Sequence, residues 1–174
     1  MKTFCEGWYV LYTKPRHEKK VYTRLKETNV DCFLPIRKAI KNLNGRRRCI
    51  EEPLFPSYLF IYLDNFQSYY LGIDTVGALG YVRTGKEIAK VNVSIVDNIK
   101  LMAKAAADLD VSEMQFQAGQ QLVISEGPLA GLSCEVVRHE QKQKLLVRVE
   151  LLNRSLLLTL PANDMIVTRS VSSR

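Results

Sequence analysis

Aromatic side chains are concentrated in one stretch of this sequence, residues 51–63, which reads Glu-Glu-Pro-Leu-Phe-Pro-Ser-Tyr-Leu-Phe-Ile-Tyr-Leu. Proline has a fixed φ and no N–H, so Pro53 and Pro56 predict an ordered, extended corner that leads into a strand. From Tyr58 onwards every residue of that strand is aromatic, Leu or Ile, which favours burial of both faces. The aromatic face is therefore covered either by a helix of this chain or by a partner that docks on it.

Basic side chains form the second candidate for binding chemistry. The net charge is +7, and residues 14–48 alone contain 12 Lys and Arg but three acidic residues. Val21 and Leu25, four positions apart, predict an amphipathic helix over residues 17–28 with a basic outer face. Such a face either meets a polyanion such as a nucleic acid or is only solvated.

Catalytic and metal-binding patterns are missing from the sequence. Its two histidines, His17 and His139, are predicted to lie in different domains, so neither gains an orienting partner from the other. The four cysteines are far apart, whereas a Cys/His metal site needs closely spaced ligands. The sequence therefore predicts a protein that is not an enzyme and uses no cofactor.

The cellular compartment is predicted from the first residues, the length of the apolar runs and the cysteines. The first residues, Met-Lys-Thr-Phe-Cys-Glu, lack a signal-peptide pattern, and no apolar run reaches the length of a membrane span. Unpaired cysteines in such a chain indicate reduced thiols. We therefore expect a cytoplasmic protein with no membrane partner.

The first part of the chain alternates strands and helices. An Asn44-Gly45 pair, in which both residues tolerate positive φ, predicts a hairpin turn within residues 38–52. This order is typical of an α+β fold, an antiparallel sheet with packed helices. The predicted strands cover residues 8–13, 32–36, 58–63 and 79–83, and the predicted helices cover 17–28, 65–71 and 94–107.

The second part of the chain is a series of short apolar strands separated by turns. Five strands in so few residues favour a small all-β barrel, which closes its own edges. Residues 108–116 are acidic and poorly periodic, so we expect a linker there, between domains at 1–107 and 117–174. The predicted barrel strands cover residues 121–124, 134–137, 145–149, 156–160 and 165–167.

Three motifs resemble those of a known family. They are Trp-Tyr-Val-Leu-Tyr-Thr-Lys at 8–14, Glu-Pro-Leu-Phe-Pro-Ser-Tyr-Leu-Phe-Ile at 52–61, and Val-Ile-Ser-Glu-Gly-Pro-Leu-Ala-Gly at 123–131. The chain resembles the NusG transcription factors, in which an α+β N-terminal domain precedes a KOW domain, an SH3-like β-barrel. The middle motif and residues 13–20 look most like the specialised antiterminators RfaH and UpxY, the latter from Bacteroides polysaccharide operons.

The resemblance implies a docking site for RNA polymerase. In the family, an aromatic concavity of the first domain binds the clamp helices of the polymerase and disfavours paused states. Strand alternation places Leu59 and Ile61 in the core, whereas Tyr58 and Phe60 point to the opposite face. The residues at positions that match the polymerase-binding site are Tyr12, Phe55, Pro56, Tyr58, Phe60 and Tyr81.

The resemblance also implies contacts with nucleic acid and with other proteins. In RfaH-like members the basic helix lies against the non-template DNA strand of the transcription bubble, and the hairpin is a second candidate contact. The KOW domain recruits a small-subunit ribosomal protein or Rho, and in RfaH it can refold as helices that mask the polymerase site. The predicted nucleic-acid-binding residues are Lys14, Arg16, His17, Lys19, Lys20, Arg24, Arg46, Arg47 and Arg48.

Two functions are compatible with the sequence. The first is a monomeric transcription elongation and antitermination factor that suppresses pausing or termination at a specific operon, such as one for polysaccharide biosynthesis. The alternative is an RNA-binding or ribosome-associated module with an internal aromatic patch. The salt dependence of binding to each partner distinguishes the two functions. An apolar contact with polymerase survives moderate salt, whereas RNA binding through Lys and Arg side chains weakens steeply as salt rises.

Overall fold

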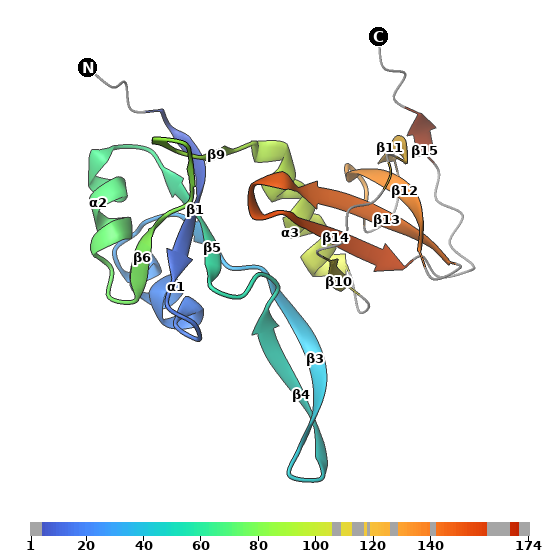
Figure 1. Ribbon diagram of the computed structural model, residues 1–174, viewed down its shortest axis with the longest axis horizontal. Coiled ribbons are helices and arrows are strands. Elements are labelled where there is room, and N and C mark those ends of the chain that lie inside the picture. Colours follow the sequence, from blue (N-terminus) through green and yellow to red (C-terminus); the bar gives the residue numbers. More distant parts are fainter. Residues whose placement is uncertain are drawn as a thin grey trace. The chain divides into compact units, whose positions relative to one another are not determined.

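A computed structural model describes residues 5–105, 109–112, 117, 119–125, 129–139, 142–159 and 168–170 of the 174 (Figure 1). The chain divides into two compact units, Met1–Val96 and Asp97–Arg174. The division lies inside the third helix, before the boundary predicted at residue 107. Among the described residues, no helix has the length and apolar character needed to cross a membrane.

The first unit is an α+β structure built on one antiparallel sheet. Its strands run in the order β2-β5-β1-β6, and β9 pairs with a further part of β1. These strands are β1 (Gly7–Thr13), β2 (Cys32–Phe33), β5 (Tyr58–Leu63), β6 (Ala78–Tyr81) and β9 (Lys90–Val91). The two helices that belong entirely to this unit are α1 (Glu18–Glu27) and α2 (Phe66–Asp74).

The two faces of the sheet are set by the register of β1 and β5. Leu59 and Ile61 point to the face where they pack with Val21 and Leu25 of α1, as predicted. The opposite face carries three cross-strand pairs, namely Trp8 with Tyr62, Val10 with Phe60, and Tyr12 with Tyr58. The alternation in β5 thus separates its aliphatic residues, which face the core, from its aromatic residues.

Helix α2 begins with a capping box. The side chain of Asn65 accepts a hydrogen bond from the Ser68 N–H at 2.8 Å, and the Ser68 hydroxyl interacts with the Asn65 backbone. Gly72, further along this helix, lies against β6 and β5. A Cβ built on Gly72 would be 2.1 Å from the Tyr81 hydroxyl oxygen and 3.0 Å from Cδ1 of Ile61. Only glycine therefore allows this close packing of helix on sheet.

We expect Gly72→Ala to destabilise the first unit. The added methyl group would push against a buried tyrosine, and such overpacking typically lowers the free energy of unfolding by about 1–3 kcal/mol. The better helix propensity of alanine offsets up to about 1 kcal/mol of that loss. Urea denaturation would measure the change. Gln67→Ala, at an exposed position of the same helix, is the control, and an equal stability for both variants would contradict the packing argument.

A two-stranded ribbon forms a separate sheet in this unit. Its strands are β3 (Ile36–Leu43) and β4 (Arg46–Pro53), and it extends away from the main sheet (Figure 1). Asn44 and Gly45 have φ of 52° and 76°, which confirms the predicted two-residue turn. The next hairpin is shorter and joins β7 (Arg83–Thr84) to β8 (Glu87–Ile88).

The second unit contains a six-stranded antiparallel sheet in the order β10-β14-β13-β12-β11-β15. The sheet-rich unit is the KOW-like region that the sequence predicts. Its strands are β10 (Leu109–Ser112), β11 (Gln120–Ile124), β12 (Ser133–His139), β13 (Lys142–Val149), β14 (Arg154–Thr159) and β15 (Thr168–Ser170), with a 3-10 turn at Glu150–Leu152. The strand predicted at 165–167 lies outside the described residues.

Two features of this unit differ from the sequence prediction. Strand β10 lies in the predicted linker and pairs with β14, with Leu109 opposite Leu158 and Val111 opposite Leu156. The apolar residues on either side of Asp110 make this strand, and Leu109 is buried. The second difference concerns the helix that is predicted at 94–107 within the first domain. In helix α3 (Val93–Ala105), the side chain of Asn98 exchanges two hydrogen bonds with the backbone of Ser133, at 2.9 and 3.2 Å, so this part of the helix belongs to the second unit.

A paired carboxylate and guanidinium join β12 to β13. Glu135 accepts hydrogen bonds from Nε and Nη2 of Arg148 at 2.7 and 2.9 Å and from the Gly119 N–H at 3.1 Å. These donors, with the Arg148 side chain first, hold the pKa of Glu135 below its ordinary value. A carboxyl group with a lowered pKa stabilises the fold above its unfolded-state pKa, and this contribution is lost as the pH falls through the folded-state pKa.

Glu135→Gln is therefore expected to lower stability at neutral pH and to lose this effect in acid. The difference in free energy of unfolding between wild type and variant should be complete above the ordinary carboxyl pKa of about 4.3 and should shrink below it. Urea denaturation at a series of pH values would measure it. A difference that stays constant down to the acid limb would show that the charge of Glu135 contributes nothing.

Candidate functional site

The corner between β4 and β5 is held by a buried carboxylate of α1. Ser57 has a φ of +67°, which is unusual for a residue other than glycine. Its N–H donates to Oε1 of Glu18 at 2.7 Å, and its carbonyl accepts from the Thr13 N–H at 2.8 Å. Glu18 is only 5% exposed. Helix α1 is thus bonded directly to the corner between β4 and β5.

Glu18 is a site residue that the sequence prediction does not include. A signal was present, because Glu18, Val21 and Leu25 are spaced as residues of one helix face. All three are buried in the structure. A carboxylate on the apolar face of a helix must find a donor, and here the donor is the strained backbone of the corner.

Three of the six predicted polymerase-binding residues reach the surface next to one another. Tyr12 is 40% exposed, Pro56 is exposed and Tyr58 is half-buried. The rings of Tyr12 and Tyr58 lie 5.2 Å apart between centroids, across the β1–β5 pair. We call Tyr12, Pro56 and Tyr58 the aromatic corner. It offers rigid apolar surface with hydroxyl groups at the edge.

The other three predicted residues are buried. Phe55 and Phe60 are 2% and 0% exposed and contact each other edge to face at 6.0 Å. They form the core next to the aromatic corner and offer no exposed surface of their own. Tyr81 lies on the opposite face of the sheet because it pairs with Leu11, whose side chain points to the helices. The structure therefore does not bring Tyr81 together with the rest.

Tyr81 has a structural partner on that opposite face. Its ring stacks on Tyr69 of α2 at 4.9 Å, and its hydroxyl donates to the Tyr69 carbonyl at 2.8 Å. Burial raises the pKa of the Tyr81 hydroxyl. This residue fixes α2 to the sheet.

The predicted basic residues of α1 and the turn before it lie on the surface. Lys14, Arg16, Lys19, Lys20 and Arg24 are exposed, and His17 is partly exposed. Lys19 donates to the Glu51 carbonyl at 3.0 Å, and Arg24 donates to the Val76 carbonyl at 2.7 Å. Within the described part of the chain, the side chains of Lys14, Arg16 and Lys20 form no hydrogen bond or ion pair. Their charges remain available for an anionic partner.

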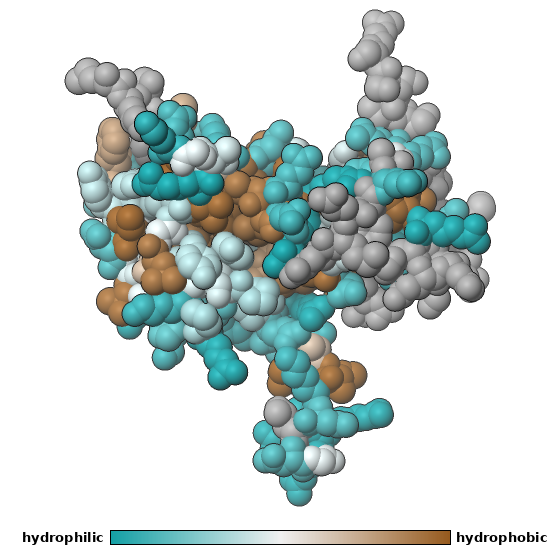
Figure 2. All heavy atoms as spheres, viewed as in Figure 1, coloured by the Kyte–Doolittle hydropathy of each residue, from teal (hydrophilic) through white to brown (hydrophobic). Residues whose placement is uncertain are grey.

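The ribbon separates its charges along its length. Glu52 pairs with Lys41 at 2.6 Å and with Arg37 at 2.9 Å, and these bases lower the pKa of its carboxyl group. Residues 46–48, the three consecutive arginines, are exposed near the turn, and no acidic partner is found for them among the described residues. Figure 2 shows a mainly hydrophilic surface on the ribbon. The structure places these arginines on a different element from the bases of α1.

The described residues do not offer a metal site or a reactive thiol pair. No group of three or more His, Cys, Asp or Glu side chains among them could hold a metal ion. Burial raises the pKa of the Cys32 thiol to about 11 and that of the Cys134 thiol to about 12. Thiols with such pKa values are protonated at neutral pH and behave as small apolar side chains.

Comparison with known proteins identifies the family. The family model described as "Transcription termination factor nusG" matches residues 6–100, more than half of the chain. The chain belongs to the NusG family. As a NusG-family member it is a transcription factor and not an enzyme, as the sequence indicated. The more specialised RfaH or UpxY type stays a prediction.

Relatives and solved structures agree with this membership. The chain is 24% identical to the transcription termination/antitermination protein NusG of Pasteurella multocida, over 88% of this chain and 90% of that protein. It is 23% identical to the protein of the same name from Streptomyces galbus, over 86% of this chain but only 56% of that longer protein. The structure titled "Domain interaction in Thermotoga maritima NusG" is 21% identical, has a TM-score of 0.50 and covers 90% of this chain and 93% of its own. The fold is therefore of NusG type.

Proposed function

We propose that this NusG-family protein is a transcription elongation and antitermination factor that binds RNA polymerase at the clamp helices. The contact uses the aromatic corner of Tyr12, Pro56 and Tyr58, and the bound protein suppresses pausing or termination in the cytoplasm. The observation that carries the proposal is the pair of neighbouring rings on a corner fixed by Glu18. The names of the relatives, which refer to termination and antitermination, support the same function.

The aromatic corner has the properties of a docking surface for a helix. Tyrosine and proline bury apolar area with little loss of conformational entropy, and tyrosine is enriched at binding hot spots. The corner is pre-organised, since the Ser57 N–H donates to Glu18 and the Ser57 carbonyl accepts from the Thr13 N–H. Pre-organisation reduces the entropy lost on binding. An amphipathic helix of the polymerase can pack its apolar face on such a surface.

The bases of α1 supply a second contact in this proposal. Lys14, Arg16 and Lys20 bind phosphates of the non-template DNA strand, and His17, Lys19 and Arg24 lie on the same helix or at its start. Phosphate contacts of this kind position a protein without reading the sequence. The three arginines of residues 46–48 provide a further contact to upstream DNA or to the polymerase, at the far end of the ribbon.

The operon and the further partners of this activity are inferred from the resemblance to RfaH and UpxY. The operon served is a specialised one, such as an operon for polysaccharide biosynthesis. The second unit recruits a small-subunit ribosomal protein or Rho, and the factor acts as a monomer. The Leu- and Val-rich strands of this unit are in the β form that their local sequence favours.

Salt dependence of binding tests the proposal against the RNA-binding alternative. Purified protein is titrated with core RNA polymerase and, separately, with single-stranded RNA, at low and moderate salt. The proposal predicts polymerase binding that survives moderate salt, because the contact is largely apolar. Tight RNA binding with a steep salt slope, together with no binding to polymerase, would support the alternative and overturn the proposal.

A further inference from the structure

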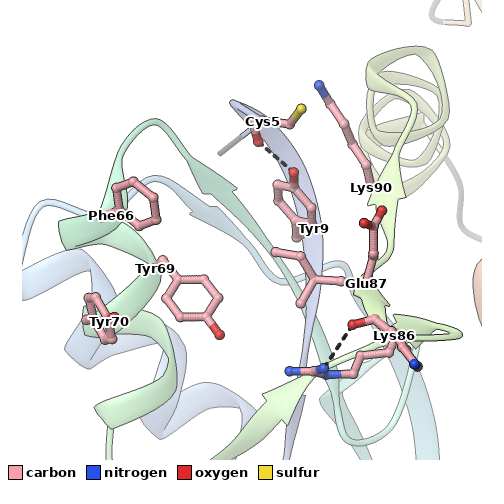
Figure 3. Close-up of a pocket in the computed structure, with 10 residues that line it drawn as sticks. Cys5, Tyr9, Phe66, Tyr69, Tyr70, Lys86, Glu87 and Lys90 are labelled. Carbon is pink, nitrogen blue, oxygen red and sulfur yellow. Dashed lines mark hydrogen bonds between the residues drawn. The ribbon is translucent and has the colours of Figure 1, made fainter. Parts of the chain in front are cut away.

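A cavity of about 460 Å³ lies in the first unit, away from the aromatic corner. One wall carries aromatic side chains of α2, the facing wall carries charged side chains of the segment from β7 to β9, and Tyr9 lies between them (Figure 3). The volume falls within the range of about 300–1,000 Å³ typical of small-ligand sites. The lining residues are Cys5, Tyr9, Phe66, Tyr69, Tyr70, Arg83, Lys86, Glu87, Ile88 and Lys90.

The aromatic wall exposes ring surface to solvent. Tyr69 is committed to Tyr81, on which it stacks. Tyr70 contacts Tyr69 edge to face at 5.3 Å and is still 58% exposed, and Phe66 is 60% exposed. Positions 66 and 70 are one helical turn apart, so both rings lie on one side of α2. Two large rings on one exposed side of a helix are suited to stacking with a flat partner.

The charged wall carries an excess of positive charge. Arg83, Lys86 and Lys90 face a single acid, Glu87. Arg83 donates to the Lys86 carbonyl at 3.2 Å and Lys90 to the Glu6 carbonyl, so neither charge is neutralised by these bonds. The side chain of Lys86 forms no hydrogen bond or ion pair with any residue that the structure describes. The wall is therefore complementary to an anion.

From these two walls we infer that the cavity binds one nucleotide of a single-stranded nucleic acid. The base stacks on Tyr70 and Phe66, and the adjoining phosphate is bound by Arg83, Lys86 and Lys90. Stacking on exposed aromatic rings requires an unpaired nucleobase. Grooves that combine such rings with Lys and Arg side chains are typical of single-strand binding. The site is built from α2 and the β7–β9 segment, so it does not depend on the contacts proposed for α1 or for the aromatic corner.

The single acid of the charged wall allows a second test, in which binding is expected to become tighter. Glu87 lies on the charged wall beside Lys86 and Lys90 (Figure 3). Its carboxylate repels a phosphate bound by those lysines. Removing the charge of Glu87 should therefore tighten binding, whereas removing the ring of Tyr70 should weaken it. A merely structural role of the cavity would not produce effects of opposite sign.

The test uses the full chain in which Lys14, Arg16 and Lys20 are replaced by alanine, so that α1 contributes little. Binding of a fluorescent single-stranded oligonucleotide, as DNA and as RNA, is measured by anisotropy at low salt. Adding Tyr70→Ala should weaken binding by about 5-fold to 150-fold, the range expected for loss of one stacked base. Lys86→Ala should weaken it and reduce the salt slope, whereas Glu87→Gln should strengthen it.

The outcomes separate this inference from the proposed function. Unchanged binding in Tyr70→Ala and Lys86→Ala would overturn the nucleotide site, even if the α1 substitutions weaken binding as proposed above. Equal affinity for duplex and single strand would also overturn it. If the cavity variants leave nucleic-acid binding unchanged but weaken binding to polymerase, the occupant is a segment of polymerase and the inference is wrong. Cross-linking of an iodouracil-substituted strand to Tyr70 would support it directly.

Discussion

Glu18→Ala is expected to lower both the stability of the first unit and its affinity for polymerase. The carboxylate is 5% exposed and accepts the Ser57 N–H at 2.7 Å. Its removal leaves a donor without a partner in the interior and releases a backbone with positive φ. Loss of a hydrogen bond to a charged group typically lowers the free energy of unfolding by about 1.5–3 kcal/mol.

In Glu18→Ala, the affinity for polymerase should fall together with the free energy of unfolding, because Ser57 lies between Pro56 and Tyr58 of the aromatic corner. A corner that samples several conformations loses more entropy on binding than a rigid one. Urea denaturation and titration with core polymerase measure the two effects. Glu18→Gln keeps an acceptor oxygen and should lose less of each.

Glu27→Ala is the matched control for Glu18→Ala. Glu27 is the last residue of the same helix, and it is exposed. Substitutions at exposed positions without special contacts usually change stability by less than about 0.5 kcal/mol. If Glu18→Ala is as stable as Glu27→Ala, the bond to Ser57 does not hold the corner.

Tyr58→Ala is expected to weaken binding to polymerase by about 30-fold or more, since truncating a hot-spot aromatic residue typically raises the binding free energy by at least about 2 kcal/mol. Tyr58 is half-buried and lies 5.2 Å from Tyr12, so its loss removes apolar contact area and leaves the Tyr12 ring without its neighbour. Tyr58→Phe keeps the ring and should bind nearly as well as wild type. Equilibrium titration at moderate salt measures the three affinities.

Tyr70→Ala is the control for this comparison. Tyr70 is also an exposed tyrosine of the first unit, but it lies on α2. Its removal should leave polymerase affinity unchanged if the aromatic corner makes the contact. Equal losses in Tyr58→Ala and Tyr70→Ala would mean that the corner is not the specific site. A urea denaturation curve for each variant excludes unfolding as the cause.

Local patterns in the sequence predicted the elements that carry the proposed contacts. Alternation from Tyr58 to Leu63 separated the aliphatic and aromatic faces, and Asn44-Gly45 gave the turn of the ribbon. Both depend on backbone geometry that neighbouring residues determine. The spacing of Val21 and Leu25 likewise gave the buried face of α1.

Features that depend on contacts between distant segments were not predicted. The family resemblance predicts Tyr81 in the aromatic concavity, but its pairing with Leu11 places it on the other face of the sheet. The acidic, poorly periodic sequence of residues 108–116 predicts a linker, but strand β10 forms there. Glu18 pairs with a backbone group 39 residues away. Sequence periodicity contains no information about such partners.

In the proposed function, the aromatic corner lets this protein act on elongating polymerase. Single-round transcription with the cognate polymerase on a template with a pause site and a terminator tests it most directly, with wild type, Tyr58→Phe and Tyr58→Ala compared at equal concentration. We expect shorter pauses and more read-through with wild type and Tyr58→Phe, but not with Tyr58→Ala. Equal activity of wild type and Tyr58→Ala, or no effect of either on elongation, would contradict it.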